Sequence, residues 1–539
     1  MKIEEVKQFF GLNKRIAVVA GGLAVCFIVL GFFNLALVLA IGFVFILLII
    51  LFSLLFYLNI RDKNVYIVAL VVFLIHMVFA MVFYVLNYHT SIRIFGGGAD
   101  FDLYQNNAIE FANRLRHGIF SVEGLYLRHY FAIIMGFIYF ITIPDPVVGQ
   151  MFTVFTSVCS AVLLYLLIVE IGGSRKWAYW ITIISSFYAS YAIFGSVLLK
   201  EIFVIPLILL SLLILIKLFK KFSLVYFIWL FIVITAIIHF RFYIGFALMF
   251  TFVICCFLIS KMSLRNKVGL SIIIGLAPAI MGFGYFGWIP INQYLALDQI
   301  RILRDVIYAP VSPEDAQKLI DEKNEVNQNN DKTAGFSEEV KKDSNKKVDF
   351  LSEGFSEDTN TTVDFFKERK KANAEFKTLE GRPLTPEEIA KTSGTSSSFS
   401  VKSETNNPFM FLVNYGISFL YSFFGPFPWQ IKEARQISAF AEVIPWWVIF
   451  VSILYGVYKS IQNEGVKKFW GKYMYALPMV IFGIISIGVI SLFINNYGII
   501  MRIRIPVLLS FLAILSFNPI FFEDTFLLFS RLLKWKNKL

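Results

Sequence analysis

Long apolar segments separated by short polar ones dominate the chain. Apolar sequence runs from about 16 to 60 with an interruption near 31–34, which predicts two membrane spans joined by a tight turn. Ten further apolar segments each predict one span: 64–87, 149–170, 178–197, 201–217, 223–239, 243–260, 268–289, 440–458, 472–494 and 503–518. The pattern therefore predicts an all-α polytopic membrane protein with about twelve transmembrane helices.

Two shorter apolar segments, 127–144 and 408–428, fit either a short span or a re-entrant helix. The basic residues favour one topology. With both segments kept on the outer side, every inner loop or tail carries at least two Lys or Arg, as the positive-inside rule requires. We therefore predict cytoplasmic termini, outer segments at 88–148 and 290–439, and an outward-facing cavity beside the two partly embedded, re-entrant or interfacial helices.

This topology divides the chain into five parts. They are an N-terminal interfacial helix with three spans, a first outer loop with interfacial helices, a six-span membrane core, a polar extracytoplasmic insert, and a C-terminal part with the re-entrant segment, three spans and a basic cytoplasmic tail. Their predicted ranges are 1–87, 88–148, 149–290, 291–407 and 408–539.

Composition supports the same class of protein. The chain is 58% hydrophobic and 16% charged, with a mean hydropathy of +0.71, which excludes a cytosolic enzyme, a disordered protein and a disulfide scaffold. The net charge is +12, yet residues 301–405 hold 17 basic and 21 acidic residues. The positive excess thus belongs to the membrane part, where the positive-inside rule explains it, and we predict membrane lipid and no nucleic acid as its surroundings.

The first outer loop holds the sharpest candidate for chemistry. Three glycines at 96–98 precede two carboxylates, Asp100 and Asp102, and a helical pattern that includes Tyr104. Either Asp is also a good helix cap, because a carboxylate accepts from the free N–H groups of the first turn. Two carboxylates after a glycine run are less well explained by capping alone.

Several polar groups fall where predicted spans meet the outer side. Each alone fits interfacial anchoring, but cations on the outer side run against the positive-inside trend, and boundary charges of this kind line substrate paths. A cluster of cations near carboxylates suits an anionic, phosphate-bearing substrate. The residues concerned are Lys200, Glu201, Arg241, Tyr243, Asn496, Arg502 and Arg504.

A proline-rich turn, GPFPWQ at 425–430, follows the apolar segment 408–424. Trp429 in this turn is either an interfacial anchor or an aromatic wall for a sugar or lipid. The histidines and cysteines have no metal-ligand spacing, and no hydrolase or nucleotide-binding motif occurs in a fitting context, so we predict no metal site built from them.

Taken in order, these motifs resemble those of the GT-C type integral-membrane glycosyltransferases, which include protein O-mannosyltransferases and aminoarabinose transferases. That superfamily places an Asp followed four residues later by a Tyr on the first large outer loop, which matches Asp100 and Tyr104. The resemblance is best over 90–290. Two departures are the additional spans before the acidic loop and a soluble insert that lies between spans. The other matching motifs are Asp102, Lys200-Glu201, Arg241–Tyr243, 426–429, 496–498 and 502–504.

The resemblance implies a sugar donor on a polyprenyl phosphate and a glycan, lipid or protein acceptor on the outer face. Asp100 would be the general base and the reaction would invert the anomeric carbon. Asp102 would position substrate or hold a divalent cation. The outer cations would hold the lipid phosphate, with Tyr104 and Trp429 beside the substrate.

Three other functions fit parts of the pattern. A polysaccharide polymerase or ligase acting on lipid-linked glycans is also many-spanning, but relies on outer-loop Arg and His. A lipid or solute transporter would concentrate its polar groups near the bilayer midplane, whereas here they crowd the outer boundary. A non-catalytic assembly protein would use the insert as a docking module.

Overall fold

A computed structural model describes residues 34–88, 100–122, 130–276, 407–431, 434–494 and 496–516. Within these ranges every regular element is a helix and no strand occurs, which confirms the predicted all-α class. The predicted N-terminal interfacial helix and first span, all but the last residue of the polar insert, and the basic C-terminal tail lie outside the described residues.

The chain forms two compact units. Unit 1 consists of Met1–Cys159 and Ala192–Phe203, and unit 2 consists of Ser160–Tyr191 and Val204–Leu539. The two long helices α7 (Pro146–Glu170) and α10 (Lys200–Lys220) therefore contribute to both units.

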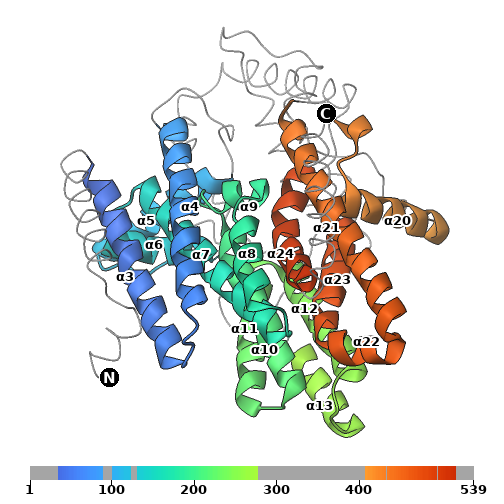
Figure 1. Ribbon diagram of the computed structural model, residues 1–539. Coiled ribbons are helices and arrows are strands. Elements are labelled where there is room, and N and C mark those ends of the chain that lie inside the picture. Colours follow the sequence, from blue (N-terminus) through green and yellow to red (C-terminus); the bar gives the residue numbers. More distant parts are fainter. Residues whose placement is uncertain are drawn as a thin grey trace, which may run out of the picture. The chain divides into compact units, whose positions relative to one another are not determined.

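In unit 1, two long helices precede a short helical pair. The first pair is α3 (Leu35–Tyr57) and α4 (Lys63–Tyr88), which contact through Phe45 and Phe73, with ring centroids 5.7 Å apart. The second pair is α5 (Asp100–Arg116) and α6 (Phe131–Ile141), which pack closely against each other. Figure 1 shows these helices in blue and cyan.

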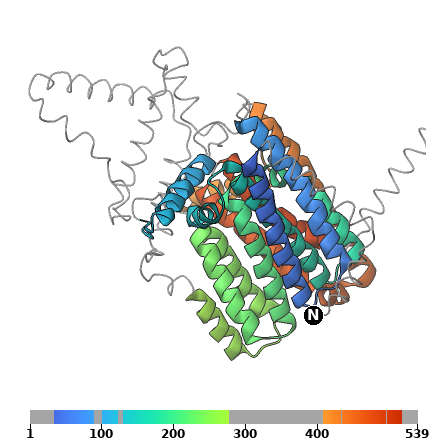
Figure 2. The same ribbon diagram turned by 90° about the vertical axis from the view of Figure 1, so that its left-hand side faces the viewer.

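Unit 2 holds the remaining helices. Beside α11 (Leu224–Phe240) runs α12 (Phe242–Leu258), and α12 also packs against α23 (Leu477–Phe493). Figure 2 shows the green helices of this region side by side. The other elements of this unit are α8 (Arg175–Ser185), α9 (Ala189–Phe194, shared with unit 1), α13 (Leu264–Gly275), α20 (Pro408–Phe424), η4 (Pro428–Gln430), α21 (Ala434–Glu464), α22 (Val466–Tyr473), η5 (Met474–Ala476) and α24 (Tyr497–Leu515).

Seven helical segments of the described chain are long and apolar enough to cross a membrane, so this is an integral membrane protein. Twelve spans, an outward-facing cavity and cytoplasmic termini stay predictions. The seven segments are Leu35–Tyr57, Lys63–Asn87, Pro146–Glu170, Lys200–Lys220, Phe440–Glu464, Val466–Leu492 and Tyr497–Leu515.

The segment 178–197, predicted as a span, is not one continuous helix. Helix α8 ends at Ser185 and α9 begins at Ala189. The hydroxyls of Ser185 and Ser186 both donate to the carbonyl of Thr182, at 2.8 and 3.3 Å. These bonds accompany the end of α8 but do not by themselves explain it, because Thr153 and Ser157 make the same kind of bond inside the unbroken helix α7.

The last predicted span, 503–518, begins too late. Helix α24 starts at Tyr497, because the Asn496 side chain caps it by accepting from the backbone N–H of Gly498 at 2.8 Å. Arg502 and Arg504 therefore lie inside the helix rather than at its end.

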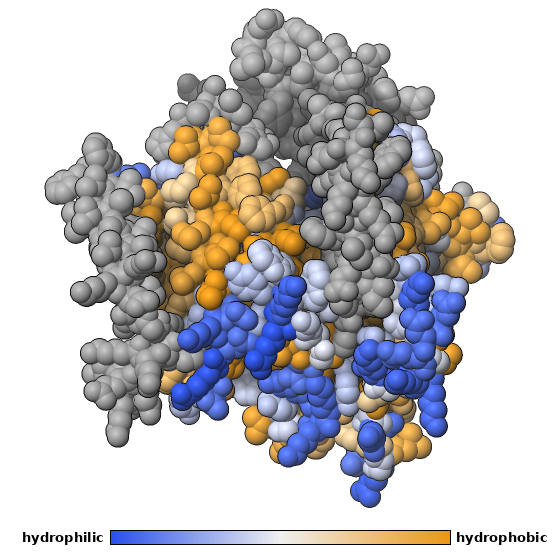
Figure 3. All heavy atoms as spheres, viewed as in Figure 1, coloured by the Kyte–Doolittle hydropathy of each residue, from blue (hydrophilic) through white to orange (hydrophobic). Residues whose placement is uncertain are grey.

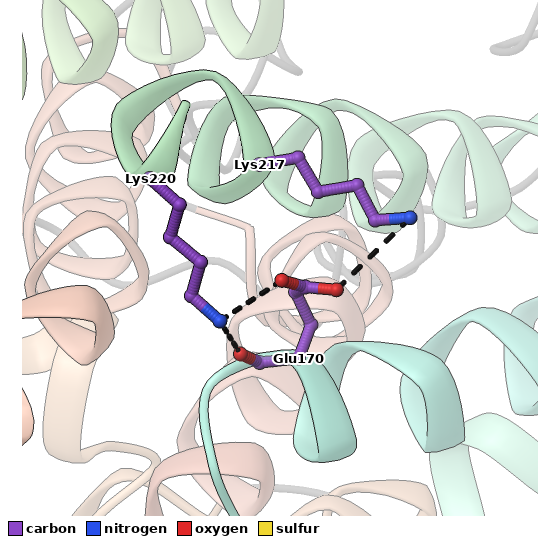
Figure 4. Close-up of polar contacts among 3 residues, drawn as sticks. All are labelled: Glu170, Lys217 and Lys220. Atoms are coloured by element: carbon purple, nitrogen blue, oxygen red, sulfur yellow. Dashed lines mark hydrogen bonds and ion pairs between the residues drawn. The ribbon is translucent and has the colours of Figure 1, made fainter. Parts of the chain in front are cut away.

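An exposed ion-pair cluster joins the ends of α7 and α10 in unit 2 (Figure 4). Lys220 Nζ lies 2.9 Å from Glu170 Oε1 and also donates to the Glu170 carbonyl, while Lys217 Nζ lies 4.0 Å from Glu170 Oε2. Both lysines occupy the last turn of α10, where the helix dipole favours positive charge.

Candidate functional site

The acidic motif opens helix α5. Asp100 is its first residue and Asp102 its third, and the side chains of both lie outside the described part of the chain. Tyr104, one helical turn after Asp100, is buried with 4% of its surface exposed. Its ring meets Phe131 of α6 edge to face, with centroids 5.6 Å apart. The helix predicted to follow the acidic motif is therefore present, and it packs against α6 through Tyr104.

Lys200 reaches this tyrosine from a point 96 residues later in the chain. Its Nζ lies 5.9 Å from the centroid of the Tyr104 ring, and the side chain is 1% exposed. A cation at this distance is attracted by the negative face of the ring. Of the residues selected from sequence, these two are brought together within unit 1.

Two glycines allow the helices around this contact to approach closely. A Cβ at Gly136 of α6 would lie 2.6 Å from a ring carbon of Phe111 on α5. A Cβ at Gly149 of α7 would lie 2.7 Å from the Tyr139 hydroxyl and 3.0 Å from Leu198. Tyr139 in turn donates to Gln105, the neighbour of Tyr104. Gly136 thus lets α6 approach α5, and Gly149 lets α7 approach Tyr139 of α6 and Leu198, which lies two residues before α10.

Glu201 follows Lys200 in the first turn of α10 and is buried, with 5% exposed. A negative charge in the first turn is favoured by the helix dipole, whereas a cation there is not. Lys200 and Glu201 are therefore two buried ionisable residues at the start of α10. Burying ionisable side chains in a membrane protein costs free energy, and such residues commonly mark functional sites.

Arg504 is buried in unit 2, and its donors are directed at helix α20. Its Nε donates to the carbonyl of Ser422 at 2.8 Å, and Nη2 donates to the same oxygen and to that of Tyr421 at 3.4 Å. Both carbonyls belong to the last turn of α20, the negative end of the helix dipole. Arg504 thus holds the end of α20 just before the turn that contains Trp429.

Glu442 is a buried carboxylate on α21 that the sequence analysis missed. Its Oε2 accepts from the hydroxyl of Ser190, and its carbonyl accepts from the Tyr188 hydroxyl at 3.1 Å. A single acidic residue inside the apolar segment 440–458 was the available signal. Its partners are Tyr188, in the unpredicted break after α8, and Ser190, in the first turn of α9.

The proline-rich turn presents an aromatic surface. Trp429 is 72% exposed and stacks on Phe427, with ring centroids 4.7 Å apart and an interplanar angle of 2°. Gln430 anchors this turn because its Oε1 accepts from the backbone N–H of Phe427 at 2.9 Å and from the Tyr497 hydroxyl of α24. The exposed face of Trp429 is suited to either a sugar ring or the lipid interface.

The remaining predicted residues also belong to unit 2. The Arg241 guanidinium lies 5.7 Å from the centroid of the buried Tyr243 ring, at the junction of α11 and α12. Arg502 is half-buried on α24. Asn496 caps that helix, which is a structural role. The gathering of these residues with Asp100 and Lys200 around one pocket stays a prediction.

Among the described residues, no group of three or more His, Cys, Asp or Glu side chains is placed to hold a metal ion. The candidate divalent cation at Asp102 falls on a side chain outside that part of the chain.

Comparison with models of protein families, with curated proteins and with solved structures finds no significant match to this chain. The resemblance to GT-C type glycosyltransferases stays a prediction based on the motifs and their order.

Proposed function

We propose that this protein is a membrane glycosyltransferase that moves a sugar from a polyprenyl-phosphate donor to an acceptor on the outer face. One observation carries the proposal. Buried Lys200, at the start of α10, lies against Tyr104 of the helix that begins with Asp100. A cation and an acidic motif near one another are what transfer from a lipid phosphate needs.

The proposed step is a single displacement. The acceptor oxygen forms a bond to the anomeric carbon, and the bond from that carbon to the phosphate oxygen breaks. The electron pair leaves with the polyprenyl phosphate, and the acceptor proton passes to the Asp100 carboxylate. Lys200 stabilises the negative charge that develops on the departing phosphate. The configuration of the sugar inverts because attack comes from the face opposite the phosphate.

The other predicted residues receive different roles. Arg504 is a positioning residue, because its donors hold the end of α20 and thereby the turn with Trp429. Arg241 and Arg502 are the further candidates for holding the donor phosphate, and Trp429 for stacking on a sugar ring. Asp102 positions substrate or a divalent cation.

The test is a transfer assay on the purified full-length protein in proteoliposomes. Radiolabelled polyprenyl-phosphate hexoses and pentoses are supplied with a panel of glycan, lipid and peptide acceptors. We expect labelled acceptor and free polyprenyl phosphate to form in equal amounts. Asp100→Asn removes the general base and should lower the rate by at least about a hundredfold.

Glu110→Gln is the matched control, because Glu110 is an exposed carboxylate on the same helix that pairs with Arg114 at 2.6 Å. It should keep the wild-type rate. Full transfer activity in the Asp100→Asn protein would remove the proposed role of that residue. Movement of intact labelled lipid across the bilayer without transfer would instead indicate a transporter, and extension of a lipid-linked glycan would indicate a polymerase.

A further inference from the structure

Helix α22 has one apolar face and one basic face. Its residues VKKFWGKY place Val466, Phe469, Trp470 and Tyr473 at positions i, i+3, i+4 and i+7, which share one face of a helix. The lysines at 467, 468 and 472 lie on the opposite face. Gly465 precedes the helix with a φ of 76°, a left-handed conformation that lets the chain turn sharply after α21.

The apolar face of α22 is only partly covered by the described protein, because Phe469 and Tyr473 are half-buried while Val466 and Trp470 are exposed. Val466 is 68% exposed and Trp470 is 45% exposed. Isolated exposed apolar residues are ordinary, but Val466 and Trp470 lie one turn apart on the same face and form an exposed edge of it. For a connector between two membrane-spanning helices, the surface at hand is the membrane interface, where Trp is enriched.

The length of the following span supports this placement. The apolar segment Val466–Leu492 has 27 residues, whereas about 20 are enough to cross the hydrocarbon core. Helix α23 begins at Leu477, after the short 3-10 turn of η5. The eight residues of α22 are therefore not needed for crossing.

The basic face has two lysines available to an external anion. Lys467 and Lys468 are exposed and form no ion pair within the described part of the chain, whereas Lys472 pairs with Glu464 at 3.1 Å. Lys220 Nζ at the end of α10 lies 5.3 Å from the ring centroid of Tyr475 in η5, but it is already paired with Glu170. Figure 3 shows hydrophilic side chains gathered around the region that Figure 1 labels α22.

We propose that α22 lies in the membrane interface and binds anionic phospholipid. Val466 and Trp470 insert at the boundary between headgroups and acyl chains, and Lys467 and Lys468 contact the phosphates of the headgroups. Charge complementarity selects this partner, because each basic residue near an anionic surface adds attraction that a zwitterionic surface does not supply. The proposal is independent of the proposed enzymatic activity.

The first measurement is native mass spectrometry of the full-length protein titrated with phosphatidylglycerol or phosphatidylcholine. We expect phosphatidylglycerol to bind several-fold more tightly. The double variant Lys467→Gln/Lys468→Gln should weaken phosphatidylglycerol binding about tenfold and leave phosphatidylcholine binding unchanged. The matched control Lys261→Gln/Arg265→Gln removes the same charge from the loop after α12 and the first turn of α13, and it should keep most of the preference.

The second measurement is hydrogen exchange of the peptide that covers residues 465–473 in nanodiscs. Exchange should be slower in discs with 30% phosphatidylglycerol than in pure phosphatidylcholine, and Val466→Asn/Trp470→Gln should abolish the difference. Equal lipid binding by the wild type and the double lysine variant would overturn the proposal. An equal loss of phosphatidylglycerol binding in the control Lys261→Gln/Arg265→Gln would also overturn it. The same holds if the rate of hydrogen exchange in α22 does not depend on the charge of the lipid.

Discussion

The buried cations of the two units differ in what holds them. In unit 1, Lys200 begins a helix and lies against the ring of Tyr104, on the helix that carries the acidic motif. In unit 2, Arg504 lies in the middle of α24 and donates to the backbone carbonyls that end α20. Buried positive charges therefore have two different roles in this protein. Arg504 holds the end of α20 in place, whereas Lys200 lies beside the helix that carries the predicted catalytic aspartate.

The largest expected effect is on stability, at Arg504. Arg504→Met removes charged hydrogen bonds to the Ser422 and Tyr421 carbonyls, and should lower the free energy of unfolding by about 3 kcal/mol. Chemical denaturation in detergent measures the loss. Arg504→Lys should recover part of it. A methionine variant as stable as the wild type would mean that Arg504 does not hold α20.

Lys200→Met should act on the rate rather than on the fold. We expect transfer to slow about a hundredfold because the charge that stabilises the leaving phosphate is gone, while the midpoint of thermal unfolding stays near the wild-type value. Parallel activity and melting measurements test this. The control Lys221→Gln removes an exposed lysine that follows α10 and should change neither quantity. The comparison between the two cations fails if Lys200→Met unfolds the protein and keeps activity per folded molecule.

Gly149→Ala tests the packing that places the start of α10. The added methyl group would lie 2.7 Å from the Tyr139 hydroxyl and 3.0 Å from Leu198, so it should cost about 2 kcal/mol of stability. Thermal or chemical unfolding measures it. At Gly42 in α3 nothing lies within 4 Å of the added carbon, so Gly42→Ala should leave stability unchanged or slightly increase it. Equal stability of the two variants would contradict the close packing around Gly149.

The smallest effect is expected at the exposed ion pairs of Figure 4. Glu170→Gln removes the charge that pairs with Lys217 and Lys220 and should cost less than about 1 kcal/mol, because solvent and salt screen exposed pairs. The measured difference should shrink further as salt is raised. A loss comparable to that of Arg504→Met would show that this cluster contributes far more to the fold than its exposure implies.

Much of the helical architecture could be predicted from sequence because membrane helices are long and uniformly apolar. The break between α8 and α9 could not be predicted, because residues 178–194 contain neither a proline nor a glycine that would mark it. The partners of Arg504 could not be predicted either, because the carbonyls that it binds lie about eighty residues earlier and belong to no motif. Glu442 was visible as a lone carboxylate in an apolar segment, but its significance depends on Ser190.

In the proposed transferase the donor binds where the Tyr104 ring of α5 meets Lys200 at the start of α10. A photoreactive polyprenyl-phosphate sugar, crosslinked to the full-length protein and mapped by mass spectrometry, tests this placement. We expect crosslinks in peptides from 100–116 and 196–205, and their loss in Lys200→Met. Crosslinks confined to other segments, with labelling unaffected by Lys200→Met, would contradict the account.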